Sequence, residues 1–117
     1  MNIEEIRNYC LSKKGVTEEF PFDETTLVFK VMGKMFALTD LEGELSINLK
    51  CDPGKAMELR ERYSCVLPGY HMNKKHWNTV LVDGSVPSLL ITEWIDHSYE
   101  QVVQKLTQKQ KHQLKTL

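Results

Sequence analysis

The sequence predicts an α+β fold in which helices pack on one face of an antiparallel sheet. Residues 44–50 alternate apolar and polar side chains strictly, and residues 26–39 can form a hairpin with one apolar face. Residues 3–11 and 90–106 instead repeat apolar side chains at helical spacing. The predicted order is helix, three strands, helix, strand and two helices.

The first helix is predicted to begin at Ile3. Asn2 is a suitable N-cap, and Glu5 completes a capping box three residues later. Gly15 is well placed to end this helix. An acidic loop follows, with the carboxylates Glu18, Glu19, Asp23 and Glu24.

Residues 26–39 predict a β-hairpin with Gly33-Lys34 as its two-residue turn. Met32 then pairs with Met35, and glycine at the first central position suits a type II′ turn. A register shift of one residue would mix apolar and polar side chains, so the pattern selects this pairing. The predicted apolar face consists of Leu27, Phe29, Val31, Phe36 and Leu38, and the opposite face of Val28, Lys30, Ala37 and Thr39.

The remaining elements follow from equally local signals. Residues 44–50 predict a strand with one wet face. Asp52-Pro53 is a typical helix start, because aspartate caps and proline fits the first helical position. A further strand is predicted from His76 to Val82, and a helix from Pro87-Ser88. Ser98 with Gln101 resembles a new capping box, so we expect a bend at Asp96-His97 and a separate last helix.

Size and composition predict one domain over residues 1–106, with residues 107–117 as a polar, basic tail or helix extension. No apolar run approaches the ~20 residues that cross a bilayer, and the acidic start does not resemble a signal peptide. The three cysteines have no metal-site or disulfide spacing. We therefore expect a monomeric cytoplasmic protein without a cofactor or membrane partner.

The net charge of −1 excludes a global basic field of the kind that draws nucleic acid. The charge is unevenly distributed, however. Residues 1–50 hold six Lys or Arg against nine Asp or Glu, and residues 51–117 hold nine against seven. The small basic excess thus lies in the half that carries residues 68–80, a segment dense in rings, lysines and amides.

Five segments of the chain form a distinctive set of motifs. They are Glu19-Phe20-Pro21-Phe22, the run from Val28 to Ala37, Pro68-Gly69-Tyr70, the run from Asn73 to Val80, and Asp96-His97-Ser98-Tyr99 with Val102-Val103. Together these segments resemble the MmcQ/YjbR family, and the resemblance covers about residues 3–106. It implies a fold similar to the bacterial frataxin homologue, a compact α+β sandwich, and a DNA-binding protein with a double-wing arrangement. It implies no catalytic residues.

DNA is the first partner that these residues suggest. Lysines contact phosphates, rings stack or form hydrogen bonds, and amides read base edges. Trp77 has an alternative interpretation as a packed residue of the strand. The candidate nucleic-acid-binding residues are Lys30, Lys34, Tyr70, His71, Lys74, Lys75, His76, Trp77 and Asn78.

Three other functional classes remain open to comparison. A frataxin-like metal role would use the acidic loop, because hard cations prefer oxygen ligands. An enzyme has no positive support, since adjacent Asp96-His97-Ser98 cannot form a triad on a helix. A protein-interaction module would use the wet sheet face with Met32 and Met35. Convergence of Lys30, Lys34, Lys74 and Lys75 on one face would favour nucleic acid, whereas an apolar and acidic face would favour a protein partner.

Overall fold

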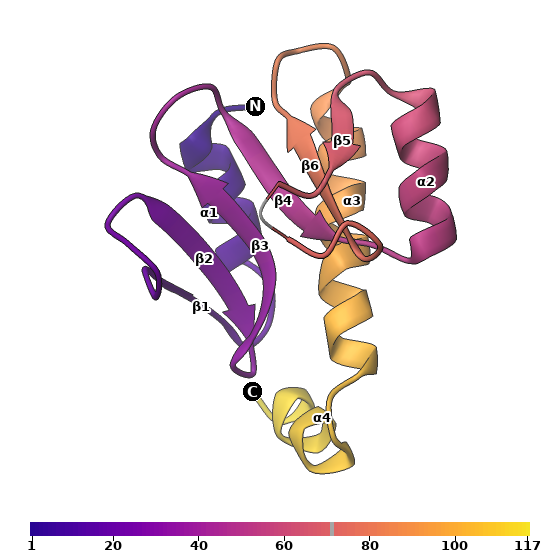
Figure 1. Cartoon of the computed structure of the whole chain (residues 1–117). Helices are drawn as coiled ribbons and strands as arrows, with labels where there is room; N and C mark the ends of the chain where they lie inside the picture. Colours follow the sequence, from indigo (N-terminus) through magenta and orange to yellow (C-terminus); the bar gives the residue numbers. More distant parts are fainter. Residues whose placement is uncertain (71) are drawn as a thin grey trace.

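A six-stranded antiparallel sheet lies at the centre of the protein in a computed structural model that describes residues 1–70 and 72–117 (Figure 1). The strand order across the sheet is β1-β2-β3-β4-β6-β5. The α+β class and the antiparallel sheet are therefore confirmed, with two more strands, β1 and β5, than the sequence pattern indicates. The strands are β1 (Val16–Glu19), β2 (Thr26–Val31), β3 (Lys34–Asp40), β4 (Ser46–Lys50), β5 (Val66–Pro68) and β6 (Trp77–Leu81).

Four helices accompany the sheet: α1 (Ile3–Leu11), α2 (Pro53–Arg62), α3 (Ser88–Gln104) and α4 (Gln108–Lys115). The longest, α3, crosses β3 and β4, while α1 contacts β1 and α2 contacts β5 and β6 (Figure 1). The Asn2–Glu5 capping box and the Asp52-Pro53 start are both present. None of the helices in the described ranges has the length and apolar character needed to span a bilayer.

The β2–β3 hairpin differs from its prediction both in its turn and by a β-bulge. The predicted Gly33-Lys34 turn is wrong, because Val31 pairs with Lys34 and the turn is Met32-Gly33, with φ values of 50° and 79°. Positive φ at both central positions is the requirement of a type I′ turn. The register then shifts between Phe29 and Lys30. Because a bulge moves later side chains to the other face, Ala37 faces the helices, and Leu38 lies with Val28 on the opposite face.

The predicted bend at Asp96-His97 is wrong, because α3 is continuous from Ser88 to Gln104. Ser98 lies buried in the middle of this helix and caps nothing. Its hydroxyl accepts a hydrogen bond from the backbone N–H of Lys50 at 2.8 Å and donates to the carbonyl of Phe36. Ser98, which the sequence pattern indicates as the start of a new helix, therefore connects the middle of α3 to the sheet.

The C-terminal residues form a separate helix rather than an extension of α3. Thr107 and Gln110 make the capping box that starts α4, and Leu114 is buried against the core. Gly15 does not end α1, which stops at Leu11. Gly15 has φ +74° and lies so close to Leu114 that a Cβ would approach the leucine Cδ1 to 2.6 Å. The turn into β1 thus provides the surface on which α4 docks.

The two faces of the sheet have different surroundings. The main core lies between the sheet and the helices, and includes Phe29, Phe36 and Ile47 from strands and Ile95 from α3. The opposite face carries a small cluster of Val28, Leu38 and Trp77, without a helix residue among the described members. This second face is the uncovered face, and it is the one turned toward the viewer in Figure 1.

Candidate functional site

The uncovered face presents one row of directly paired residues across all six strands. Directly opposed residues in an antiparallel sheet point to the same face, so the register defines the row. The row begins on the polar edge strand and ends on the apolar one. Its members, in spatial order, are Glu19, Val28, Leu38, Asn48, Thr79 and Leu67.

A groove with a volume of about 780 Å³ lies over the centre of this row. This volume is within the ~300–1,000 Å³ range of typical ligand sites. Two loops border it, one between β1 and β2 and the other between β5 and β6. The lining residues are Phe22, Asp23, Thr26, Leu38, Thr39, Asp40, Ser46, Asn48, Leu67, Pro68, Tyr70, Met72, Thr79 and Leu81.

The floor of the groove contains an ordered polar pair. The hydroxyl of Thr79 donates to Oδ1 of Asn48 at 2.6 Å and accepts from the backbone N–H of Tyr70 at 2.9 Å. These bonds fix the orientation of the Asn48 amide. Within the described part of the chain, its Nδ2 group has no acceptor, so the floor offers a hydrogen-bond donor to a ligand.

The walls of the groove are apolar and exposed. Phe22 retains 64% of its surface, Tyr70 69% and Leu67 43%. Exposed apolar side chains gathered around a concavity are typical of interaction sites. Met72 packs from the β5–β6 loop against the Val28–Leu38–Trp77 cluster, so this loop also covers part of the uncovered face.

Two carboxylates stand at one end of the groove. Asp40 pairs with Thr26 across β3 and β2, and the hydroxyl of Thr26 donates to Oδ2 of Asp23 at 3.1 Å. Backbone N–H groups of Thr25 and Thr26 bond Oδ1 of Asp23 and hold the pKa of that carboxyl below its usual range. No lysine or arginine is among the described residues that line the groove.

Two of the predicted phosphate-binding lysines are engaged elsewhere. Lys30 forms an ion pair with Glu19 at the β1 edge. The ammonium of Lys74 donates to the carbonyl of Gly69 at 3.0 Å, just beyond β5 at the other edge. Lys34 and Lys75 are exposed. Lys30, Lys34, Lys74 and Lys75, whose convergence on one face would favour nucleic acid, are all outside the described lining of the groove.

Trp77 and Asn78 are buried, with exposed fractions of 8% and 2%. The packed interpretation of Trp77 is therefore confirmed. Asn78 accepts from Nε of Arg60 at 2.6 Å and donates to the carbonyl of Ala56, which ties β6 to α2. Arg60 also donates to the carbonyl of Lys74, so the predicted segment is held by α2. These contacts remove both side chains from a direct base-reading role.

The other predicted residues have different positions. Tyr70 lines the groove, and its backbone N–H bonds Thr79. His76 is half-buried, and its carbonyl accepts from the N–H of Cys51. His71 lies outside the described residues. Met32 and Met35 are half-buried rather than surface residues.

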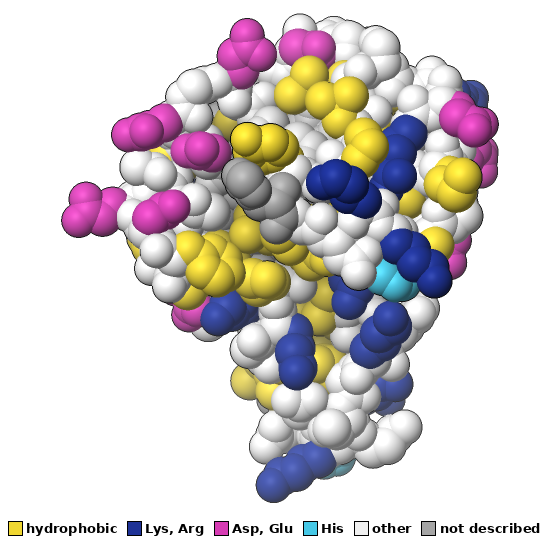
Figure 2. All heavy atoms as spheres, viewed as in Figure 1, with side chains coloured by type: hydrophobic (Ala, Val, Ile, Leu, Met, Phe, Trp, Pro, Cys, Tyr) yellow, Lys and Arg dark blue, Asp and Glu magenta, His cyan; other side chains and the backbone are white. Residues whose placement is uncertain are grey.

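Charge is unevenly distributed on this face. Figure 2 shows an apolar area in yellow at the centre, carboxylates in magenta mainly along the left and upper edges with others at the right edge, and lysines and arginines in dark blue mainly to the right of the centre and below. Burial lowers the pKa of Lys50, and the positive charges of Lys105 and Lys34 lower it further. Residues 101–117 hold four lysines and no carboxylate.

Sequence reasoning missed Asn48, Asp40 and Phe22 as site residues. The strict alternation of residues 44–50 does place Asn48 on the wet face, and this was the available signal. The pattern gives no indication that Thr79 lies opposite Asn48, because the two strands are separated by a helix and a further strand.

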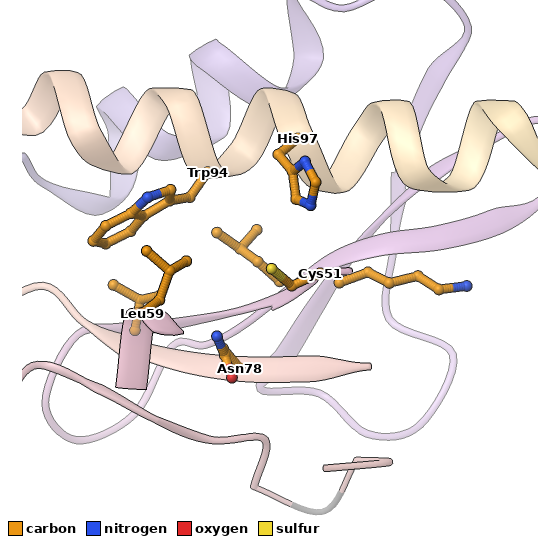
Figure 3. A pocket seen from close by; sticks show the side chains of 8 residues that line it. Cys51, Leu59, Asn78, Trp94 and His97 are labelled. Carbon is orange, nitrogen blue, oxygen red and sulfur yellow. The ribbon is translucent and has the colours of Figure 1, made fainter. Parts of the chain in front are cut away.

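A second, much smaller cavity lies on the helix side of the sheet and is lined by Cys51, Leu59, Asn78, Trp94 and His97 among others (Figure 3). Its volume of about 10 Å³ holds at most one water. His97 projects from α3, and its Nε2 accepts from the N–H of Asp52 at 3.2 Å. Burial raises the pKa of Cys51 to about 11, which makes that thiol unreactive.

The bond to Asp52 predicts a pH dependence of stability. Burial, followed by the nearby charge of Lys55, lowers the pKa of His97 in the folded protein. The unfolded chain therefore takes up the proton first, and stability present above about pH 6.5 falls as the pH decreases toward the folded-state pKa. We expect His97→Gln, which keeps an acceptor, to flatten the stability profile between about pH 7 and pH 5 in urea titrations. Parallel profiles for the two proteins would contradict this prediction.

The acidic segment predicted as a metal site is largely occupied by internal contacts. Glu18 lies in β1 and binds Arg7 through two hydrogen bonds of 2.6 and 2.7 Å. Glu19 binds Lys30, and Asp23 caps its own loop. Among the residues that the structure describes, no three His, Cys, Asp or Glu side chains are grouped to hold a metal ion.

The chain is similar to members of one protein family. The family model described as YjbR matches residues 11–101. The chain is 36% identical over 112 residues to the uncharacterised protein YjbR of Escherichia coli K12, with 95% of each chain covered. It is 40% identical over 91 residues to the uncharacterised protein YbdF of Escherichia coli O157:H7, covering 77% of this chain and 75% of that protein.

Solved structures agree with the sequence relatives. The crystal structure of Deinococcus radiodurans protein DR2400 matches with a TM-score of 0.90 and 42% identity, covering 97% of this chain and 87% of that one. A crystal structure from Pseudomonas syringae matches with a TM-score of 0.74 and 28% identity, covering 86% and 98%. The matched family model and these relatives together show that the chain belongs to the YjbR family, as its sequence motifs predict.

Proposed function

We propose that the protein is a non-enzymatic interaction module whose groove binds a segment of a partner protein. The observation that carries this proposal is the lining of the groove. Exposed Phe22, Leu67 and Tyr70 surround a polar floor, and two carboxylates stand at one end. A groove lining that is apolar, carries two carboxylates and includes no lysine or arginine among its described residues favours a protein over a nucleic acid, because phosphate is repelled by fixed carboxylates.

Nucleic-acid binding is the second candidate, and it would use cations outside the groove lining. Burial, and then the charges of Lys105 and Lys34, lower the pKa of Lys50, so these three lysines are the candidates for phosphate contact. Three phosphate contacts on B-DNA correspond to a log–log salt slope of about −2.7. Binding of this kind would be weak at physiological salt and would not use Lys74, whose ammonium is already bonded to Gly69.

Selection of peptides tests the first candidate. We expect random dodecapeptides displayed on phage to be enriched by the purified full chain and to shift amide signals of groove residues in NMR spectra. Leu67→Ser should weaken the selected peptides about tenfold, because an exposed apolar side chain that a partner covers can contribute more than ~1 kcal/mol to binding. Leu89→Ser is the matched control, since Leu89 is 68% exposed on α3 outside the groove lining.

The same preparations distinguish the two candidates. Binding of labelled duplex and single-stranded DNA is measured by fluorescence anisotropy at several salt concentrations. A label on the DNA is preferable to tryptophan fluorescence, because Trp77 and Trp94 are buried and report poorly on surface binding. DNA binding that is lost in Lys34→Ala/Lys105→Ala, without peptide enrichment, would replace the first candidate by the second. If the selected peptides bind the Leu67→Ser variant as tightly as the original chain, the groove is not their binding site.

Other expectations from the sequence stay predictions. The likeness to the bacterial frataxin homologue is one of them, and a metal-binding role depends on it. The cytoplasm is the location we propose, because Cys10, Cys51 and Cys65 are all free thiols and buried.

A further inference from the structure

The charge of the groove is unbalanced. Asp23 and Asp40 are the carboxylates in its lining, and the described lining contains no cation. Ion pairs within the described chain join Arg7 to Glu18, Lys13 to Asp96 and Lys30 to Glu19, so none of them neutralises either aspartate. Two carboxylates beside exposed apolar walls thus favour a partner that brings positive charge.

Both carboxylates are held in place before any partner arrives. Asp23 accepts from the N–H of Thr25 at 3.0 Å and of Thr26 at 2.6 Å. Oδ1 of Asp40 accepts from the N–H of Glu42 at 2.9 Å, and no hydrogen bond within the described chain engages its other oxygen. Fixed acceptors lose little conformational freedom on binding, so an arginine or lysine meets a preorganised end of the groove.

The width of the groove matches a short extended peptide. From Asp40 on β3 to Leu67 on β5 the path crosses three strand spacings, through β4 and β6, and runs two residues along β3, because Leu38 is the β3 residue in the row of Leu67. At ~4.8 Å per spacing and ~3.3 Å per residue this is roughly 14–16 Å, or about four to five residues of extended chain. On β4, one spacing from β3, the Asn48 amide offers its donor to a backbone carbonyl, and Leu38, Leu67 and Met72 provide apolar contact.

We propose that the groove binds an extended segment of a partner protein that places an arginine or lysine side chain against Asp23 and Asp40 and, about four residues away, an apolar side chain against Leu67. This inference rests on the proposed function, because it names the occupant of the same groove. It adds the charge, the conformation and the spacing of that occupant.

Labelled pentapeptides of defined sequence test the inference. The probes are Leu-Ala-Val-Ala-Arg and its reversed order, each also made with lysine, with citrulline and with glutamate in place of arginine. We expect the better arginine peptide to bind the full chain roughly three- to tenfold more tightly than its citrulline form, since two exposed charge pairs contribute on this scale. Lysine should resemble arginine, and glutamate should bind least.

Matched variants locate the effect. Asp23→Asn and Asp40→Asn retain an oxygen for the backbone bonds, so the loops keep their acceptors while the charges are removed. The double variant should bind arginine and citrulline peptides equally. Asp83→Asn is the control, because Asp83 caps the N–H of Ser85 in the same way but outside the groove lining.

The outcomes separate the two proposals. Equal binding of arginine and citrulline peptides that still depends on Leu67 would overturn the charge inference and leave groove binding intact. Binding of free arginine amide as tightly as the peptide would replace the protein segment by a small cationic ligand. Failure of every pentapeptide, together with failed phage selection, would overturn both.

Discussion

We expect Trp77→Ala to lower the free energy of unfolding by about 3–5 kcal/mol, the usual cost of truncating a buried aromatic side chain. Trp77 is 8% exposed and packs with Val28 and Leu38 on the uncovered face. A helix cannot close over the resulting hole, because the helices lie on the other side of the sheet. Urea denaturation followed by far-UV circular dichroism measures the change.

The matched comparison is Tyr70→Ala. Tyr70 is 69% exposed on the groove wall, and its backbone bond to Thr79 does not depend on the side chain. We expect it to change stability by less than about 0.5 kcal/mol, as exposed substitutions usually do. A cost below about 1 kcal/mol for Trp77→Ala would instead identify Trp77 as an available surface ring.

The second large effect is expected for Ser98→Ala, at about 2–4 kcal/mol. Ser98 is fully buried, accepts from the N–H of Lys50 at 2.8 Å and donates to the carbonyl of Phe36. Alanine leaves both backbone groups without this partner, and each buried unsatisfied group costs about 1–3 kcal/mol. Hydrogen exchange at the Lys50 amide should accelerate together with the loss measured by urea denaturation.

Thr92→Ala controls for loss of a hydroxyl in the same helix. The hydroxyl of Thr92 returns to the carbonyl of Leu89 within α3 and bonds no strand. We expect this variant to stay within about 0.5 kcal/mol of the original chain. Equal effects at the two positions would show that helix propensity, rather than the bond to the sheet, accounts for the Ser98 result.

Ser98 also marks the limit of local reasoning. Ser98 and Gln101 have the spacing of a capping box, and the actual capping boxes at Asn2 and Thr107 use the same chemistry. The Ser98 case differs because its hydroxyl bonds backbone groups of the sheet instead of capping a helix. Phe36 and Lys50 lie 62 and 48 residues away from Ser98 along the chain, yet both bond its hydroxyl. Such distant partners leave no trace in a local pattern.

The bulge had a similar effect on the hairpin. An uninterrupted two-residue alternation assigns Leu38 to the helix-covered face, whereas the extra residue in β3 transfers it to the uncovered face. Sequence alternation cannot reveal one inserted position when apolar side chains occur on both faces. Leu38 is thereby available to the groove.

The sequence by itself determined the α+β class and the capped starts of α1 and α2, because these depend on neighbours within a few residues. It left Trp77 open between a packed residue and a nucleic-acid contact, and burial in the folded sheet decided for packing. Family membership also followed from local motifs.

The tertiary structure decided where a partner can bind. Asn48, Thr79 and Leu67 come from three strands that meet only in the folded sheet, and Asp40 meets Asp23 only through Thr26. Packing of β6 against α2 also enclosed Asn78, whose amide bonds the carbonyl of Ala56. The ammonium of Lys74 is engaged locally by the carbonyl of Gly69. The candidate site thus moved from a dense run of rings and lysines to a groove that no single segment contains, since its geometry is a property of strand register.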